Sequence, residues 1–216
     1  MNSRHRSLRG FTLLEVLISL LILLIGLLGV AALMLKGQRA SFEGYQRQQA
    51  LAMAQEMAEK IRTNQGAARC YVTGTTDGGT MPGWGNLFAI YSGRSPADNC
   101  LGSACDSEDM AQRHLETWDG VLYGAAESKD AATDTCVGNE CVGGIIGARG
   151  CVEWPDNDLD RPVFWVSVAW QGEGSTVAPA ATESACGAGL YGTAERRRLV
   201  TLRVSTSPLA PGGPCP

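Results

Sequence analysis

The sequence predicts an α+β fold in which a long N-terminal helix packs on an antiparallel β-sheet. Two observations lead to this prediction. The first is an apolar stretch of membrane-spanning length near the N-terminus, which continues without proline into an amphipathic helical segment. The second is a group of short segments in the C-terminal half in which apolar and polar residues alternate, as half-buried strands require. A helix followed by a run of strands is typical of the α+β class.

The chain begins with a basic leader, residues 1–10, which contains three arginines and no acidic residue. The stretch from Phe11 to Leu35 is mainly apolar, and residues 16–35 are about as many as a helix needs to cross a bilayer. Basic residues favour the cytoplasmic side of a membrane. We therefore expect a transmembrane segment at about 16–35, with the leader in the cytoplasm and the rest of the chain in the periplasm.

Glu15 is the only charged residue of this apolar stretch. A carboxylate costs about 2.5 to 3.5 kcal/mol at the centre of a bilayer, so it needs a partner. If the chain is cut after Gly10, the new α-amine of Phe11 lies one helical turn from Glu15, which is a distance at which two groups pair.

This region resembles a known processing signal over Arg9-Gly10-Phe11-Thr12-Leu13-Leu14-Glu15-Val16. The segment is similar to the class III signal of type IV prepilins and type II secretion pseudopilins. The resemblance implies cleavage after Gly10 by an inner-membrane prepilin peptidase, N-methylation of Phe11, and a role for Glu15 in aligning the subunit with its neighbour during filament assembly.

Two simpler interpretations of the N-terminus exist. One is a secretory signal peptide with a cleavage site near Gly29-Val30-Ala31, and the other is a plain membrane anchor. The apolar run is longer than the apolar region of a usual signal peptide, which has about 7 to 15 residues. An acidic residue before that region also has no role in a signal peptide. The prepilin interpretation is therefore preferred.

The helix is expected to continue beyond the membrane, because residues 37–62 contain no proline and many strong helix formers. Taken over residues 11–62, it would be roughly 78 Å long at 1.5 Å per residue. An apolar stripe at helical spacing should pack on the globular domain. Its members are Ala50, Met53, Ala54, Met57, Ala58 and Ile61.

The segment from Gln38 to Asn64 is similar to the type IV pilus modification protein PilV family, as is the segment from Ile25 to Gly29. Family members also tend to carry an amphipathic helix with a tryptophan and a later strand ending in Val-x-Trp-Gln, which here correspond to residues 106–118 and 168–171. The resemblance implies a type IV pilin fold and a minor pilin. It also implies other minor pilins, the major pilin and a large pilus-tip adhesin as partners.

Residues 63–216 are expected to form one periplasmic globular head. Asp106 or Ser107 is a candidate N-cap for a helix through Trp118. Strands are predicted over residues 149–154, 163–171 and 199–205. In the second strand Phe164, Val166, Val168 and Trp170 share one face, and in the third Val200, Leu202 and Val204 point inward.

All cysteines lie after the apolar stretch, and their number is even, which suits an oxidising compartment and disulfide bonds. They are Cys70, Cys100, Cys105, Cys136, Cys141, Cys151, Cys186 and Cys215. Their spacing does not choose among the possible pairings. A zinc site is the alternative, but histidine is nearly absent after the leader, so disulfides are preferred and no metal or cofactor is expected.

Other features have simple interpretations. The acidic residues of 156–160 resemble the start of a calcium loop but lack its later glycine and glutamate. The run from Glu195 to Arg198 is expected to be a charged turn before the last strand, with a contact patch for an acidic partner as the alternative. His114 is expected on a helix surface. No catalytic or phosphate-binding motif is found, so the chain is not expected to be an enzyme.

The net charge of the whole chain is −4, and loss of the three leader arginines lowers it to −7, which does not favour nucleic-acid binding. The sequence therefore predicts a minor type IV pilin that helps to initiate pilus assembly or lies near the tip. It would stay in the inner membrane before assembly and lie on the cell surface afterwards. The alternatives are a minor pseudopilin of a type II secretion system and a membrane-anchored periplasmic binding domain that does not polymerise.

Overall fold

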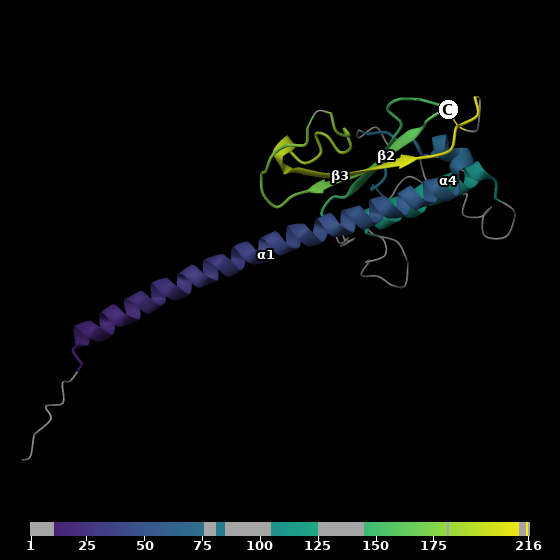
Figure 1. The fold of residues 1–216 in the computed structure, drawn as a ribbon. Coiled ribbons are helices and arrows are strands. Elements are labelled where there is room, and N and C mark those ends of the chain that lie inside the picture. The colour runs from purple at the N-terminus through teal and green to yellow at the C-terminus, as the bar shows by residue number, and fades with distance from the viewer. Residues whose placement is uncertain are drawn as a thin grey trace, which may run out of the picture. The chain divides into compact units, whose positions relative to one another are not determined.

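The computed structural model describes residues 11–75, 81–84, 105–124, 145–180, 182–211 and 215. The helices are α1 (Leu13–Thr63), η1 (Gln65–Tyr71), α4 (Ser107–Tyr123) and η3 (Ala194–Arg196), and the strands are β1 (Arg149–Glu153), β2 (Val163–Gln171) and β3 (Arg197–Ser205) (Figure 1). The chain divides into two compact units, residues 1–42 and 43–216. Helix α1 begins in the first unit and ends in the second.

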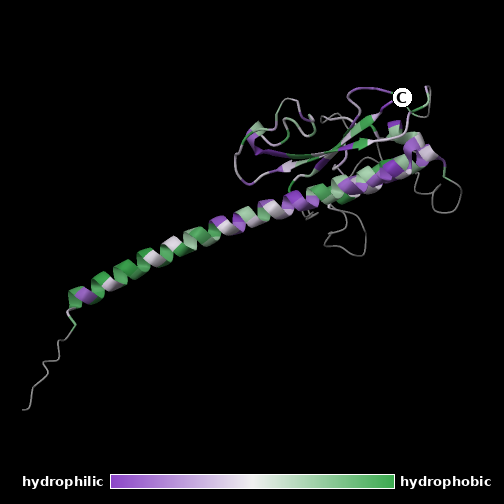
Figure 2. Ribbon diagram, viewed as in Figure 1, coloured by the Kyte–Doolittle hydropathy of each residue, from purple (hydrophilic) through white to green (hydrophobic). Residues whose placement is uncertain are grey.

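The first unit consists of the apolar part of α1. Its large apolar side chains, from Leu13 to Leu35, are each at least half exposed. The ribbon is mainly green, and so hydrophobic, over this part, whereas polar and apolar residues mix in the later part of the same helix (Figure 2). The helix begins two residues later and ends one residue later than the sequence suggested, since Phe11 and Thr12 precede its first turn.

The core of the second unit lies between the C-terminal part of α1, helix α4 and one face of the sheet. The predicted apolar stripe of α1 is confirmed, because all of its members belong to this core except that Met53 is only partly buried. From the sheet come Val152, Phe164, Val166, Val168, Trp170, Val200, Leu202 and Val204. The fold is therefore the expected α+β arrangement of a long helix and an antiparallel sheet, which is consistent with the pilin fold.

Within the described residues, the sheet has three antiparallel strands in the order β1-β2-β3. Arg149 pairs with Ala169 in the first ladder, and Val163 pairs with Ser205 in the second. All three predicted strands are confirmed, and β3 begins two residues earlier than expected. The register places the apolar residues of neighbouring strands on the same face, which explains why this face is buried.

The opposite face of the sheet is also partly buried, which the alternation in β2 did not indicate. A second, smaller core forms there from Met81, Cys151, Ala169, Cys186 and Tyr191. Ser167 is fully buried beside it. The expectation of a half-buried strand was therefore incomplete, because part of the connection between β2 and β3 folds back over this face.

Helix α4 has the capping residues that its sequence predicted. The Asp106 carboxylate accepts hydrogen bonds from the backbone N–H groups of Glu108 and Asp109, at 3.0 and 2.8 Å. Gly124 ends the helix in the left-handed conformation, with φ of 87°. The buried indole of Trp118 donates a hydrogen bond of 3.0 Å to the backbone carbonyl of Met53, which joins α4 to α1.

Candidate functional site

The candidate functional site is the start of α1, where the processing signal lies. Thr12 caps the helix, since its side-chain oxygen accepts a hydrogen bond from the backbone N–H of Glu15 at 3.3 Å. Its backbone carbonyl accepts from the same N–H at 3.1 Å. Threonine at the cap and glutamate three residues later form the sequence of a capping box. Glu15 therefore occupies a position that also favours the start of the helix.

The side chains at this end of α1 face outward. Phe11 is 83% exposed, and Glu15 is exposed in the first helical turn. Negative charge in the first turn is favourable because the helix dipole is positive there. Within the described part of the chain, no hydrogen bond or ion pair of the Glu15 carboxylate is found. The carboxylate is thus open to a partner outside these residues.

The apolar surface of the first unit has to be shielded from water. Helix α1 is the one helix in the described ranges that is long and apolar enough to cross a membrane. No residue in the most apolar stretch of this helix is buried in the structure. An exposed apolar surface of this extent indicates a membrane or other protein chains around it.

The predicted site residues fall in different parts of the chain. Gly10 lies outside the described residues, as do Cys100, Cys136 and Cys141. The structure pairs Cys70 with Cys215 and Cys151 with Cys186. Cys105 is also disulfide-bonded. The pairings join residues far apart in the sequence, and spacing had not chosen among them.

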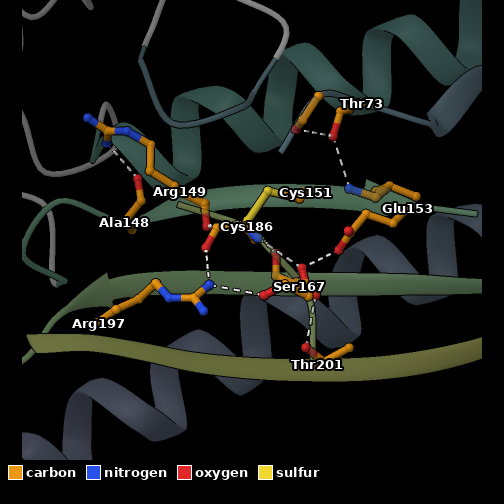
Figure 3. Close-up of a disulfide and its surroundings, with 12 residues drawn as sticks. Thr73, Ala148, Arg149, Cys151, Glu153, Ser167, Cys186, Arg197 and Thr201 are labelled. Carbon is orange, nitrogen blue, oxygen red and sulfur yellow. Dashed lines mark hydrogen bonds between the residues drawn. A yellow bond between two sulfur atoms is a disulfide. The ribbon is translucent and has the colours of Figure 1, made fainter. Parts of the chain in front are cut away.

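The disulfide between Cys151 and Cys186 attaches the β2–β3 connection to β1 (Figure 3). Around it, the guanidinium group of Arg197 donates hydrogen bonds to the backbone carbonyls of Ser184 and Cys186, at 3.0 and 2.9 Å. The Ser184 hydroxyl donates to the Glu153 carboxylate and accepts from the backbone N–H of Cys186. The connection is therefore held to both β1 and β3.

The sequence did not indicate Glu153, Ser184 or the local role of Arg197. Glu153 ends one strand and lies in no motif, whereas Arg197 begins another strand and was noted only as part of the charged run from Glu195 to Arg198. Cys186 was the only signal in this connection. A disulfide predicts that a loop is held, but it does not predict which polar groups surround it.

His114 lies on helix α4, as expected, but its side chain makes contacts that the sequence did not indicate. His114 is half-buried, and its Nδ1 lies 2.6 Å from the hydroxyl of Tyr71, whose ring stacks on the imidazole. Burial lowers the pKa of His114, and the nearby charge of Lys60 lowers it further while Glu56 opposes this. Burial raises the pKa of Tyr71 to about 12, against the effect of a hydrogen bond from Asn64. The pair is a polar contact within the head.

The two charged motifs of the C-terminal half are turns. The Asp158 carboxylate accepts hydrogen bonds from the backbone N–H groups of Asp160 and Arg161, at 2.9 and 3.2 Å. No group of His, Cys, Asp and Glu residues suited to a metal occurs among the residues described. The segment from Glu195 to Arg198 is the expected charged turn, formed by η3 and the start of β3. Arg198 forms an ion pair of 3.1 Å with Glu43 of α1.

Comparison with known protein families gives one match. Residues 6–31 match the prokaryotic N-terminal methylation motif, which covers the end of the basic leader, the capped start of α1 and the first part of the apolar helix. The chain matches no curated protein and no solved structure. The motif implies processing by a prepilin peptidase and assembly with other pilins, and it suggests a structural rather than a catalytic protein. Together with the long apolar helix and the antiparallel sheet, it supports a type IV pilin-type protein, that is, a pilin or pseudopilin-like subunit.

Proposed function

We propose that this chain is a minor type IV pilin of the PilV kind, which helps to initiate pilus assembly or lies near the pilus tip. The observation that carries the proposal is the methylation motif over residues 6–31, followed by an exposed apolar helix of membrane-spanning length. An apolar helix of this kind is anchored in a membrane before assembly. In a filament, the same surface packs against other subunits.

In this proposal the chain has three parts. Residues 1–10 are the leader, residues 11–62 are the long helix with its transmembrane segment at about 16–35, and residues 63–216 are the periplasmic head. The peptidase cleaves after Gly10 and the new terminus at Phe11 is methylated. The partners are other minor pilins, the major pilin and a large pilus-tip adhesin.

The PilV assignment depends on the segment from Gln38 to Asn64 and on the helix and strand that resemble that family in the head. The helix with the tryptophan is α4, and the strand ending in Val-x-Trp-Gln is β2. A minor pseudopilin of a type II secretion system is the alternative, since the methylation motif is common to both classes. Deletion of the gene followed by measurement of piliation, twitching and protein secretion separates them.

Glu15 is proposed to pair with the processed N-terminus of its own or a neighbouring subunit and so to set the axial register. The capped helix start offers a second explanation, because Thr12 caps the helix and Glu15 stands at the capping-box position, from which a glutamate can also bond the backbone N–H of the capping residue. Glutamine serves in a capping box as well as glutamate does. Glu15→Gln therefore separates the charge from the local effect.

The experiment compares the yield of sheared pili from strains in which Glu15→Ala, Glu15→Gln or Glu15→Asp replaces the wild-type copy. We expect the Ala and Gln variants to be exported, cleaved and folded but to support few pili, because both lack the charge. The Asp variant should lie between them and wild type, since its side chain is shorter. A normal yield from the Ala variant would show that Glu15 has no assembly role. A normal yield from Gln alone would assign its role to helix capping.

A further inference from the structure

The two outer edges of the sheet differ in how they are covered. At β1, the backbone N–H of Val152 donates to the Thr73 hydroxyl, and its carbonyl accepts from the Thr73 N–H, both at 2.9 Å. The N–H of Gly150 donates to the carbonyl of Pro82, also at 2.9 Å. The edge at β1 is therefore closed by other parts of the chain.

The edge at β3 is open over the described residues. Two hydrogen bonds fix the register at its ends, from the N–H of Gly172 to the carbonyl of Arg196 and from the N–H of Thr206 to that of Pro162. In an antiparallel ladder, alternate residues turn their backbone groups toward the neighbouring strand. The N–H and carbonyl groups of Leu199, Thr201 and Arg203 consequently point away from β2. None of them has a backbone hydrogen bond within the described ranges.

A hollow borders this edge on each face of the sheet. One, of about 230 Å³, lies on the face of the disulfide and is lined by Trp165, Leu199, Thr201 and Arg203 together with residues 182–184. The other, of about 360 Å³, lies on the face of α1 and is lined by Ala58, Glu59, Arg62, Leu202 and Val204 among others. Arg203 borders both. The side chains of an added strand point alternately to the two faces, so each hollow would receive every second side chain.

The charge at this edge indicates the chemistry of the strand that fits. Arg203 is exposed, and its guanidinium group lies over the ring of Trp165 at 5.1 Å. No ion pair of Arg203 is found among the residues the structure describes, whereas Arg62 pairs with Glu59 and Arg198 pairs with Glu43. Glu183 lines the first hollow without pairing with Arg203. An acidic side chain opposite Arg203 would complete the charge pairing at this level.

We propose that the outer edge of β3 is a docking site for an extended segment of another protein, which adds a fourth strand to the sheet. The segment carries an acidic residue facing Arg203 and small apolar residues facing the hollow between α1 and β3. Backbone hydrogen bonds to Leu199, Thr201 and Arg203 supply affinity, and the two hollows supply selectivity. This site goes beyond the proposed pilus function and does not depend on it.

The test uses the full chain in detergent micelles and a capped seven-residue peptide in which aspartate and threonine alternate with valine. Two control peptides have the same sequence with lysine in place of aspartate, or with N-methyl groups on the edge-facing amides. We expect the aspartate peptide to bind, to slow hydrogen exchange at the amides of Thr201 and Arg203, and to lose binding on N-methylation. Equal binding of the N-methylated peptide would overturn the proposal.

Variants at Arg203 separate backbone pairing from charge. Arg203→Pro removes one outward-facing N–H and is tolerable because that group is not used in the β2–β3 ladder. It should abolish peptide binding, whereas Arg203→Gln keeps the N–H and should only weaken it. Arg203→Glu should weaken binding of the aspartate peptide about tenfold and favour the lysine peptide.

Unchanged binding by the proline variant, with the disulfides and thermal unfolding intact, would refute the proposal. A peptide-free dimer that Arg203→Pro abolishes would instead identify a second copy as the occupant and refute it too.

Discussion

The contact between Tyr71 and His114 shows how a partly exposed histidine on a helix takes part in the packing of the head. The Tyr71 hydroxyl lies between the Nδ1 atom of His114 at 2.6 Å and the backbone carbonyl of Lys60 at 3.2 Å. It also accepts a hydrogen bond of 3.3 Å from the side-chain amide of Asn64. One polar group thus joins the end of α1, η1 and α4. The protonation of His114 in this cluster should therefore affect the stability of the head.

Because the pKa of His114 is lowered in the folded protein, the unfolded chain binds more protons as the pH falls. The contribution of His114 to the free energy of unfolding is therefore fully present above the unfolded pKa of about 6.5. It decreases as the pH drops through that value toward the folded pKa. We expect His114→Gln to show a smaller loss of unfolding free energy between pH 7.5 and pH 5 than wild type. Urea unfolding of both proteins at several pH values measures this. An identical pH dependence would mean that His114 does not contribute.

At the scale of elements, the contact between β1 and α4 depends on a glycine. A Cβ atom at Gly150 would lie 2.4 Å from the ring of Trp118 and 2.5 Å from the side chain of Leu122. Both partners are buried in the main core, so neither can move aside easily. The φ angle of Gly150 is not in the left-handed region, which makes the requirement one of space rather than of backbone conformation.

Gly150→Ala is therefore expected to lower the free energy of unfolding by about 1 to 3 kcal/mol through overpacking. Gly174→Ala is a matched control, because a Cβ atom there meets nothing within 4 Å. The control should change stability by less than about 0.5 kcal/mol. Denaturant unfolding of the two variants measures the difference, and equal stabilities would show that α4 shifts to accept the methyl group.

The sequence was most informative where a periodic pattern decides burial. The alternation in residues 163–171 predicted β2, and the helical stripe of Ala50 to Ile61 predicted which side of α1 faces the sheet. The cap at Asp106 was also predictable, since capping is a local interaction. Periodicity reports burial by the partner layer and does not report a loop that returns to the other face. The second core around Cys186 and Tyr191 was missed for this reason.

Of the two proposed sites, the motif around Glu15 was predictable from the local sequence, whereas the edge of the sheet at β3 was not. The motif around Glu15 is continuous, so it was visible in the chain and matches a family model. The capping position of Thr12 adds a local role that the motif alone did not suggest. The open edge at β3 was not predictable, because it depends on which strand lies in the middle and on where residues 73 and 82 fold.

At the scale of the whole chain, the head is held by covalent links between distant segments. The disulfide from Cys70 to Cys215 spans a sequence separation of 145, and that from Cys151 to Cys186 spans 35. In the chain-entropy model, a bridge over such separations stabilises a fold by about 3 to 5 kcal/mol, more for the longer one. The first joins the end of the helical region to the C-terminal segment, and the second covers the outer face of the sheet. Such links suit a domain exposed outside the cytoplasm.

In the proposed function the chain is processed before it acts as a pilin, and we expect this processing to depend on Gly10. A peptidase that cuts at the membrane surface needs a small residue before the cleaved bond, so Gly10→Val should retain the ten-residue leader. Ser7→Val, which changes the leader away from the bond, should be cleaved as wild type is. Intact-mass measurement of the membrane-bound proteins distinguishes these outcomes, and it also reports the methyl group expected on Phe11. Equal loss of the leader from both variants would contradict the prepilin assignment. Retention only in Gly10→Val would support it, since the two substitutions add the same side chain within one leader.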